Sequence, residues 1–68
     1  MKPVSGRRMC KAMKRKGWTH TRTESSHYMF NRADSPLTIA VPVHGNQDMP
    51  TGTQRRIMRQ AGLTDADL

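Results

Sequence analysis

The residue best suited to chemistry is His27, which stands in the segment 24–30 between two basic parts of the chain. Binding a polyanion requires only lysines and arginines, so an imidazole between cationic segments indicates a chemical role. Because the unperturbed pKa of imidazole is about 6.5, one such ring can both accept and donate protons near neutral pH. The 2′-hydroxyl of RNA attacks the adjacent phosphorus once its proton is removed. The placement of His27 therefore predicts RNA cleavage.

The charge of the chain favours a nucleic acid as its partner. Twelve lysines and arginines stand against five acids, which gives a net charge of +7. Such an excess attracts polyanions by counterion release and electrostatic steering. A membrane surface would accept the same charge, but that function needs a long helix with bulky apolar residues, and none is present. No apolar run approaches the roughly 18 residues that span a bilayer.

The length of 68 residues predicts a single domain, residues 1–68, with a small core. Only 34% of the residues are hydrophobic, so we expect the aromatic residues Trp18, Tyr28 and Phe30 to be needed in that core. A partner or a homo-oligomer would supply further stability. A single cysteine excludes an internal disulfide, and the first residues lack the apolar stretch of a signal peptide, so we expect a cytoplasmic protein.

Two further histidines and the cysteine carry weaker signals. His20 alternates in phase with Trp18 and Arg22, and His44 lies in a polar loop after a proline, so we expect both to be structural or to contact RNA. No pair among these residues has the spacing of about two to five residues that is typical of zinc sites, so no metal or other cofactor is expected. Cys10 should behave as a small apolar residue.

A first helix is predicted from about Gly6 to Lys16, with Ser5 as its N-cap and Gly17 as its stop. At about 100° per residue, one arc of this helix is cationic and the opposite arc is apolar. The cationic arc contains Arg7, Arg8, Lys11, Lys14 and Arg15, and the apolar arc contains Met9, Cys10, Ala12 and Met13. Because this helix has no acid, its charge is unbalanced and available for RNA.

Alternating apolar and polar residues predict three strands, at Trp18–Thr23, His27–Asn31 and Leu37–Val41. Ser25 and Ser26 form the turn between the first two. In the second strand the period of two places Tyr28 and Phe30 on one face and His27 on the other. We therefore expect the imidazole to lie outside the aromatic core.

A second helix is predicted from about Gly52 to Ala61, where Gly62 follows. Its apolar arc contains Gln54, Ile57, Met58 and Ala61, and the other side contains Arg55, Arg56 and Arg59. Residues 63–68 are expected to form a frayed or short helical tail.

The order helix, three strands, helix predicts an α+β fold. Its architecture would be α-β-β-β-α, with a three-stranded antiparallel sheet and both helices on one face. This is the layout of a double-stranded-RNA-binding-like domain.

Nearly the whole chain resembles the HicA toxins, the mRNA interferase half of HicA–HicB type II toxin–antitoxin pairs. The resemblance rests on the order and spacing of Ser5-Gly6, Gly17-Trp18, Arg22, Ser26-His27, Val41-Pro42-Val43-His44, Gly52-Thr53, Ile57 and Gln60-Ala61-Gly62-Leu63. It implies that His27, the histidine of the family's Gly-Ser-His tripeptide, is catalytic and that a HicB-like antitoxin covers it. Ser25 replaces the family's glycine, so we expect the loop before His27 to sit slightly differently. Gln54 replaces an apolar residue, so we expect the second helix to pack less tightly against the sheet.

From this resemblance and the chemistry of RNA cleavage we expect His27 to be a general base or acid, with water or another group making the second proton transfer. Arg22 and either Lys14 or Lys16 would be supporting cations, and Ser26 would position the imidazole or the phosphate. The remaining expected RNA contacts are Arg7, Lys11, Arg55 and Arg59. The alternatives are a module that binds double-stranded RNA without cleaving it and a ribosome-associated protein.

Overall fold

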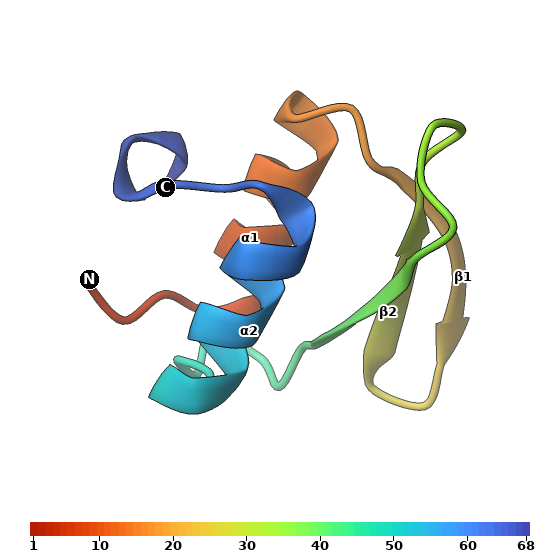
Figure 1. Ribbon diagram of the computed structural model, residues 1–68. Coiled ribbons are helices and arrows are strands. Elements are labelled where there is room, and N and C mark those ends of the chain that lie inside the picture. Colours follow the sequence, from red (N-terminus) through yellow and green to blue (C-terminus); the bar gives the residue numbers. More distant parts are fainter.

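The computed structural model describes residues 1–68 and contains two helices, three strands and one short 3-10 turn. In chain order these are α1 (Gly6–Arg15), β1 (Thr19–Glu24), β2 (His27–Asn31), β3 (Thr38–Pro42), α2 (Thr51–Ala61) and η1 (Asp65–Asp67). The strands form one antiparallel sheet in the order β1-β2-β3, and both helices lie on the same side of it (Figure 1). The predicted α-β-β-β-α fold is confirmed.

Helix α1 begins and ends close to the predicted positions. The Ser5 hydroxyl accepts a hydrogen bond from the backbone N–H of Arg8 at 3.2 Å, which satisfies one of the free amide groups of the first turn. The helix ends at Arg15, one residue earlier than expected, because Lys16 is its C-cap and Gly17 takes a positive φ of 94°. Only glycine adopts that backbone conformation without steric cost.

The pairing of β1 with β2 contains an irregularity that the sequence did not predict. His20 pairs with Phe30 and Arg22 pairs with Met29, so the register shifts across Thr21. His20 therefore stacks on Tyr28 with ring centroids 4.9 Å apart, whereas Arg22 lies on the opposite face of the sheet. The expectation that His20 and Arg22 share a face is wrong, because a bulge inserts one residue and reverses the alternation.

Strand β3 lies at the edge of the sheet and begins one residue later than predicted. Leu37, the predicted first residue, is 40% exposed and precedes the strand. Ile39 and Val41 are buried against the helices. Pro42, the last strand residue, pairs with His27. Proline has no backbone N–H to donate to a neighbouring strand, and an edge strand tolerates this loss.

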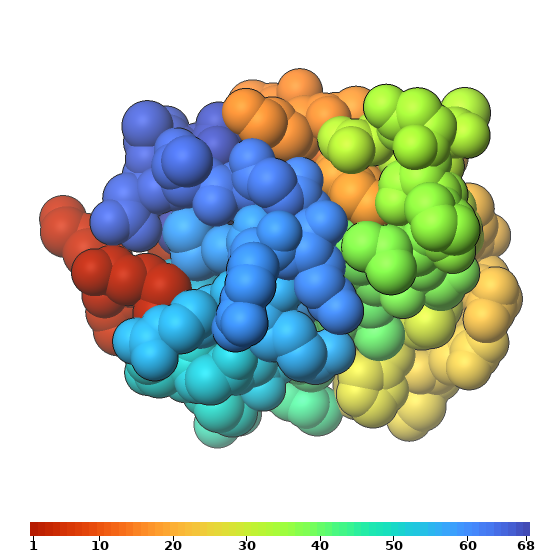
Figure 2. Space-filling model, viewed as in Figure 1, coloured from red at the N-terminus to blue at the C-terminus, as the bar shows by residue number.

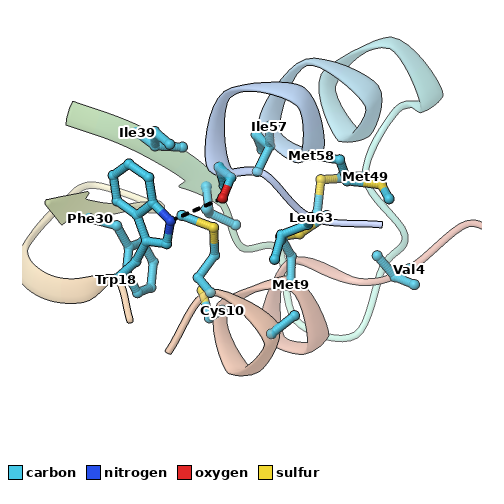
Figure 3. Packing of buried hydrophobic residues seen from close by; sticks show 14 residues of the cluster. Val4, Met9, Cys10, Trp18, Phe30, Ile39, Met49, Ile57, Met58 and Leu63 are labelled. Atoms are coloured by element: carbon cyan, nitrogen blue, oxygen red, sulfur yellow. Dashed lines mark hydrogen bonds between the residues drawn. The ribbon is translucent and has the colours of Figure 1, made fainter. Parts of the chain in front are cut away.

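One hydrophobic cluster fills the space between the sheet and the two helices (Figure 3). Trp18 and Phe30 are buried in it as predicted, whereas Tyr28 is only half-buried at its margin. The indole N–H of Trp18 donates to the Ala61 carbonyl at 3.2 Å, which joins the start of β1 to the end of α2. Burial raises the pKa of the Cys10 thiol to about 11, so this thiol is protonated at neutral pH.

Gln54 has a structural role that the sequence did not predict. Its side chain is fully buried, and both ends of its amide are satisfied. The side-chain oxygen accepts from the Val4 N–H at 3.0 Å, and the side-chain nitrogen donates to the Lys2 carbonyl at 2.6 Å. Gln54 thus binds the first residues of the chain to α2, which an apolar side chain could not do.

The final residues are held against α1. Leu63 is buried, and η1 follows with the Thr64 backbone N–H donating to the Asp67 carboxylate. That hydrogen bond, with help from Lys16 at 3.4 Å, lowers the pKa of Asp67 below its usual value. Arg15 donates to the Asp67 carbonyl at 2.7 Å. The first and last segments consequently lie beside each other on one side of the molecule (Figure 2).

Neither helix has the length and apolar character needed to cross a membrane.

Gly6 is required for the close approach of α1 to the end of β3. A Cβ atom at this position would overlap the carbonyl oxygen of Pro42 and lie 2.9 Å from the Val43 Cα. Because both neighbours are backbone, Gly6→Ala is expected to lower the free energy of unfolding by about 1–3 kcal/mol. Urea denaturation followed by circular dichroism measures this. Gly52→Ala is the control, since nothing lies within 4 Å of a Cβ there. Equal stability of the two variants would contradict the requirement.

Replacing Gln54 tests the attachment of the first residues. Gln54→Leu keeps a side chain of similar length but leaves the Val4 N–H and the Lys2 carbonyl without partners. We expect the free energy of unfolding to fall by about 1–3 kcal/mol, with faster hydrogen exchange at the Val4 amide. Gln60→Leu, at an exposed position of the same helix, should change stability by only about 0.5 kcal/mol. Unchanged exchange at Val4 in the Gln54 variant would refute this role.

Candidate active site around His27

His27 is the first residue of β2, and its side chain is exposed. Its strand neighbours are Glu24 on β1 and Pro42 on β3. Tyr28 and Phe30 face the helices, so the alternation of the strand places His27 on the other face, as predicted. Of the three histidines, only His20 uses its ring in a hydrogen bond within the chain. The His27 imidazole is therefore free to bind a substrate.

The turn before His27 fixes where the imidazole stands. Ser25 and Ser26 form a two-residue hairpin loop between Glu24 and His27. Ser25 has a positive φ of 57°, the only such value at a residue other than glycine. Positive φ at the first central position alone is the pattern of a type II′ turn, in which glycine is preferred. Ser25 therefore adopts a backbone conformation that favours glycine, at a steric cost.

Ser26 joins the hairpin turn to the segment that follows β3. Its carbonyl accepts a hydrogen bond from the Val43 N–H at 2.8 Å. The next residue is His44, the start of the loop 44–50 that leads into α2. This loop and the hairpin turn consequently lie at the same end of the molecule (Figure 1), and the segment after β3 fills the space between the turn and the start of α2 (Figure 2).

A cavity of about 540 Å³ opens beside His27. This volume is within the range of about 300–1,000 Å³ for ligand-binding pockets. Residues of β2, β3, the loop and α2 line it, namely His27, Ala40, Pro42, His44, Gln47, Asp48, Met49, Pro50, Thr53 and Arg56. Two imidazoles and one guanidinium thus surround the same space, together with one carboxylate. General acid–base catalysis on a phosphate ester requires side chains of these types.

The loop that carries His44 is fixed by contacts with two other segments. The Arg7 side chain donates to the Gly45 carbonyl at 3.1 Å, and the Met49 N–H donates to the Val4 carbonyl at 3.0 Å. Ser5 and Asp48 form a single antiparallel bridge. The first residues of the chain and the first turn of α1 therefore determine the position of the cavity wall opposite His27.

Two of the predicted supporting residues lie near His27. Ser26 directly precedes it, and Arg22 is its diagonal neighbour across the β1–β2 pair, at the typical separation of about 7–8 Å. Arg22 forms an ion pair with Glu24, the strand partner of His27. The positive charge of Arg22 is consequently offset in the free protein.

The structure does not bring Lys14 or Lys16 to His27. The Lys16 carbonyl accepts a hydrogen bond from Arg32, which follows the last residue of β2. His27 begins that strand, and five steps of about 3.3 Å place His27 about 17 Å from Arg32. Lys14 is in the last turn of α1, toward the same end as Lys16. Both lysines lie near the far end of the sheet.

The remaining predicted RNA contacts divide into two groups. Arg7, Arg8, Lys11 and Arg15 line a second hollow of about 390 Å³ that reaches Asn46 in the loop. Arg55 and Arg59 are exposed on α2 but do not line the cavity. Arg56 lines the cavity instead, although it was not among the predicted RNA contacts. The spacing of three residues between Thr53 and Arg56 could have indicated that both face the same side, because residues three apart lie along one edge of a helix.

No group of three histidine, cysteine, aspartate or glutamate side chains converges closely enough to hold a metal ion. The charged and hydroxyl-bearing side chains that line the cavity provide two imidazoles, one guanidinium, one carboxylate and one hydroxyl.

The chain matches a known protein family over most of its length. Residues 6–63 match the family described as the HicA toxin of bacterial toxin–antitoxin systems. The matched range includes both helices, the whole sheet and the cavity around His27. No curated protein matches the chain. Because the match covers most of the chain, and because its fold agrees with the expected one, the chain belongs to the HicA toxin family of toxin–antitoxin systems.

Proposed function

We propose that this toxin is a metal-independent endoribonuclease that cleaves mRNA, with His27 as the general base or acid. The observation that carries the proposal is the exposure of the His27 ring beside a cavity that also contains the Arg56 guanidinium. An imidazole can move protons near neutral pH, and a guanidinium can offset the charge that develops on a phosphate. The membership in a toxin family agrees with such a destructive activity.

The proposed reaction is the attack of an RNA 2′-hydroxyl on the adjacent phosphorus. A base removes the proton of the 2′-hydroxyl, and the 2′-oxygen forms a bond to phosphorus. The bond between phosphorus and the 5′-oxygen breaks, and that oxygen takes up a proton. The products are a 2′,3′-cyclic phosphate and a 5′-hydroxyl. His27 performs one of the two proton transfers, and Arg56 stabilises the negative charge of the phosphorane.

RNA would reach the cavity along the basic face of α1. Arg7 lies in the first turn of that helix and also bonds to the loop carrying His44. On one side of the loop is the hollow lined by four α1 residues, and on the other side is the cavity. A phosphate chain that crosses the loop would meet Lys11 and Arg7 before His27. Exposed Arg55 and Arg59 would add further contacts to phosphates.

A toxin–antitoxin family implies an antitoxin as the partner. We propose that this antitoxin is HicB-like and inhibits the toxin by covering His27. The net charge of +7 favours an acidic surface on that partner. An acidic segment that enters the cavity would pair with Arg56 and exclude RNA from the imidazole.

The first test is His27→Gln, which removes proton transfer while keeping a polar side chain of similar size. Cleavage of mRNA should fall by about 10²–10⁴-fold, because general acid–base catalysis contributes that much. The affinity for RNA, measured by fluorescence anisotropy, should stay close to that of the parent protein, because phosphate contacts elsewhere dominate binding. His20→Gln, which removes an imidazole outside the cavity, is the control.

Cleavage by the His27 variant at the rate of the parent would refute the catalytic assignment. Binding of RNA by the parent without any cleavage would instead indicate a module that binds double-stranded RNA or ribosomes.

A second test compares two arginines of α2. Arg56→Gln should lower kcat by more than about tenfold, because it removes a charge that acts on the transition state. Arg59→Gln, on the same helix but outside the cavity, should leave kcat nearly unchanged and raise KM slightly through the loss of a phosphate contact. Steady-state kinetics on one defined RNA separates the two effects. Equal changes in kcat for the two variants would show that Arg56 has no special position.

A further inference from the structure

We propose that His44 performs the second proton transfer of the cleavage reaction, so that the site contains a pair of histidines with complementary roles. This inference rests on the proposed endoribonuclease function and deepens it. Sequence reasoning assigned His44 only a structural or RNA-contacting role. Its position in the structure gives it a chemical one.

The reaction needs two groups because two protons move at different oxygens. One proton leaves the 2′-hydroxyl as the 2′-oxygen attacks, and another arrives at the 5′-oxygen as its bond to phosphorus breaks. An alkoxide is a poor leaving group, so protonation of the 5′-oxygen lowers the barrier. In an in-line attack the entering and leaving oxygens stand on opposite sides of phosphorus. One imidazole on one wall of a site cannot readily reach both.

His44 lies where the second group is needed. It lines the same cavity as His27, but it comes from the loop after β3, whereas His27 comes from the start of β2. Its side chain is exposed, and its ring makes no hydrogen bond within the chain. The loop is anchored at Gly45 by Arg7 and at Met49 by Val4, so its position is defined before substrate binds. Such preorganisation is what a catalytic group requires.

The other cavity side chains do not suit the task. The Arg56 guanidinium supplies N–H donors and a positive charge rather than a site that accepts a proton. The Asp48 carboxylate offers acceptor oxygens and is not suited to protonate a departing oxygen. The Thr53 hydroxyl and the Gln47 amide do not titrate near neutral pH. Among the residues that line the cavity, His44 is the one besides His27 that carries an imidazole, the side-chain type suited to both accepting and donating a proton.

The charges around the cavity support the same arrangement. Arg56 supplies a fixed positive charge for the phosphorane oxygens. The start of α2 also lies at the cavity, since Pro50 and Thr53 line it, and the first turn of this helix contains no acid. The positive end of the helix dipole therefore adds to the attraction for phosphate. A phosphate drawn to this position would lie in the cavity that the two histidines share.

Two protons move in the proposed step, and each has a donor and an acceptor. One imidazole accepts the 2′-hydroxyl proton while the 2′-oxygen bonds to phosphorus, and the other, as an imidazolium, gives its proton to the departing 5′-oxygen. The site is left with its two protonation states exchanged. Hydrolysis of the cyclic phosphate, or exchange of protons with water, restores the starting state. No metal or other reactant takes part.

The experiment compares two forms of one oligoribonucleotide. One form is ordinary RNA, and the other has sulfur in place of the 5′-oxygen at the site that the parent protein cuts. A thiolate leaves without protonation, so a variant that lacks only the general acid should recover on the sulfur substrate. Single-turnover rates are measured for the parent protein, His27→Gln, His44→Gln and the control His20→Gln. Circular dichroism establishes that each variant is folded.

On ordinary RNA, both the His27 and the His44 variants should be about 10²–10⁴-fold slower than the parent. On the sulfur substrate, one of these two variants should return to within about tenfold of the parent rate, and the other should remain slow. The variant that recovers identifies the acid. The His20 variant should match the parent on both substrates, because its ring stacks on Tyr28 outside the cavity.

Cleavage of ordinary RNA by the His44 variant at the parent rate overturns the proposal. Persistent slowness of both variants on the sulfur substrate also overturns it, because neither histidine would then be the acid. A His20 variant as slow as the His44 variant would show that loss of an imidazole acts through the fold. By contrast, undiminished cleavage by the His27 variant overturns the proposed function itself.

Discussion

The contact between the first turn of α1 and the end of β3 is the constraint on which the site depends. Gly6 has no side chain, so the helix backbone meets the backbone of Pro42 and Val43 directly. Pro42 is the strand partner of His27, and Val43 is bonded to Ser26. One close approach between backbones therefore sets the separation of α1, the hairpin turn and the loop. In a chain with so small a core, this contact positions a site that hydrophobic packing alone would leave loosely defined.

The distribution of charge follows from the same arrangement. Several basic side chains of α1 and the sheet are engaged within the protein, including Arg22 with Glu24, Arg32 with Asp34, and Lys16 with Asp67. These exposed pairs contribute little stability. The Arg32 and Lys16 pairs reduce the positive field at the far end of the sheet, and the Arg22 pair reduces it beside His27. Arg56 has no acidic partner and lies in the cavity. The Arg56 guanidinium therefore brings to the cavity a positive charge that no ion pair within the chain offsets.

Much of the fold could be predicted because its signals are local. Ser5 and Gly17 delimit the first helix, and alternation placed His27 on the face away from Phe30. The bulge at Thr21 could not be predicted, because no glycine or proline marks it. The burial of Gln54 was also missed, since its partners are backbone groups about fifty positions away in the chain. His44 and Arg56 line the same cavity as His27 because of tertiary folding. The sequence of the loop and of the helix therefore could not predict that these two residues lie near His27.

The first few residues have a significance that their place outside the matched family range conceals. Val4 and Ser5 hold the backbone of the loop that carries His44, and Gln54 holds them in turn from α2. A substitution or a fused affinity tag at these positions can thus alter the geometry of the cavity around His27 without changing any residue of the matched range. A comparison restricted to residues 6–63 would not reveal the cause.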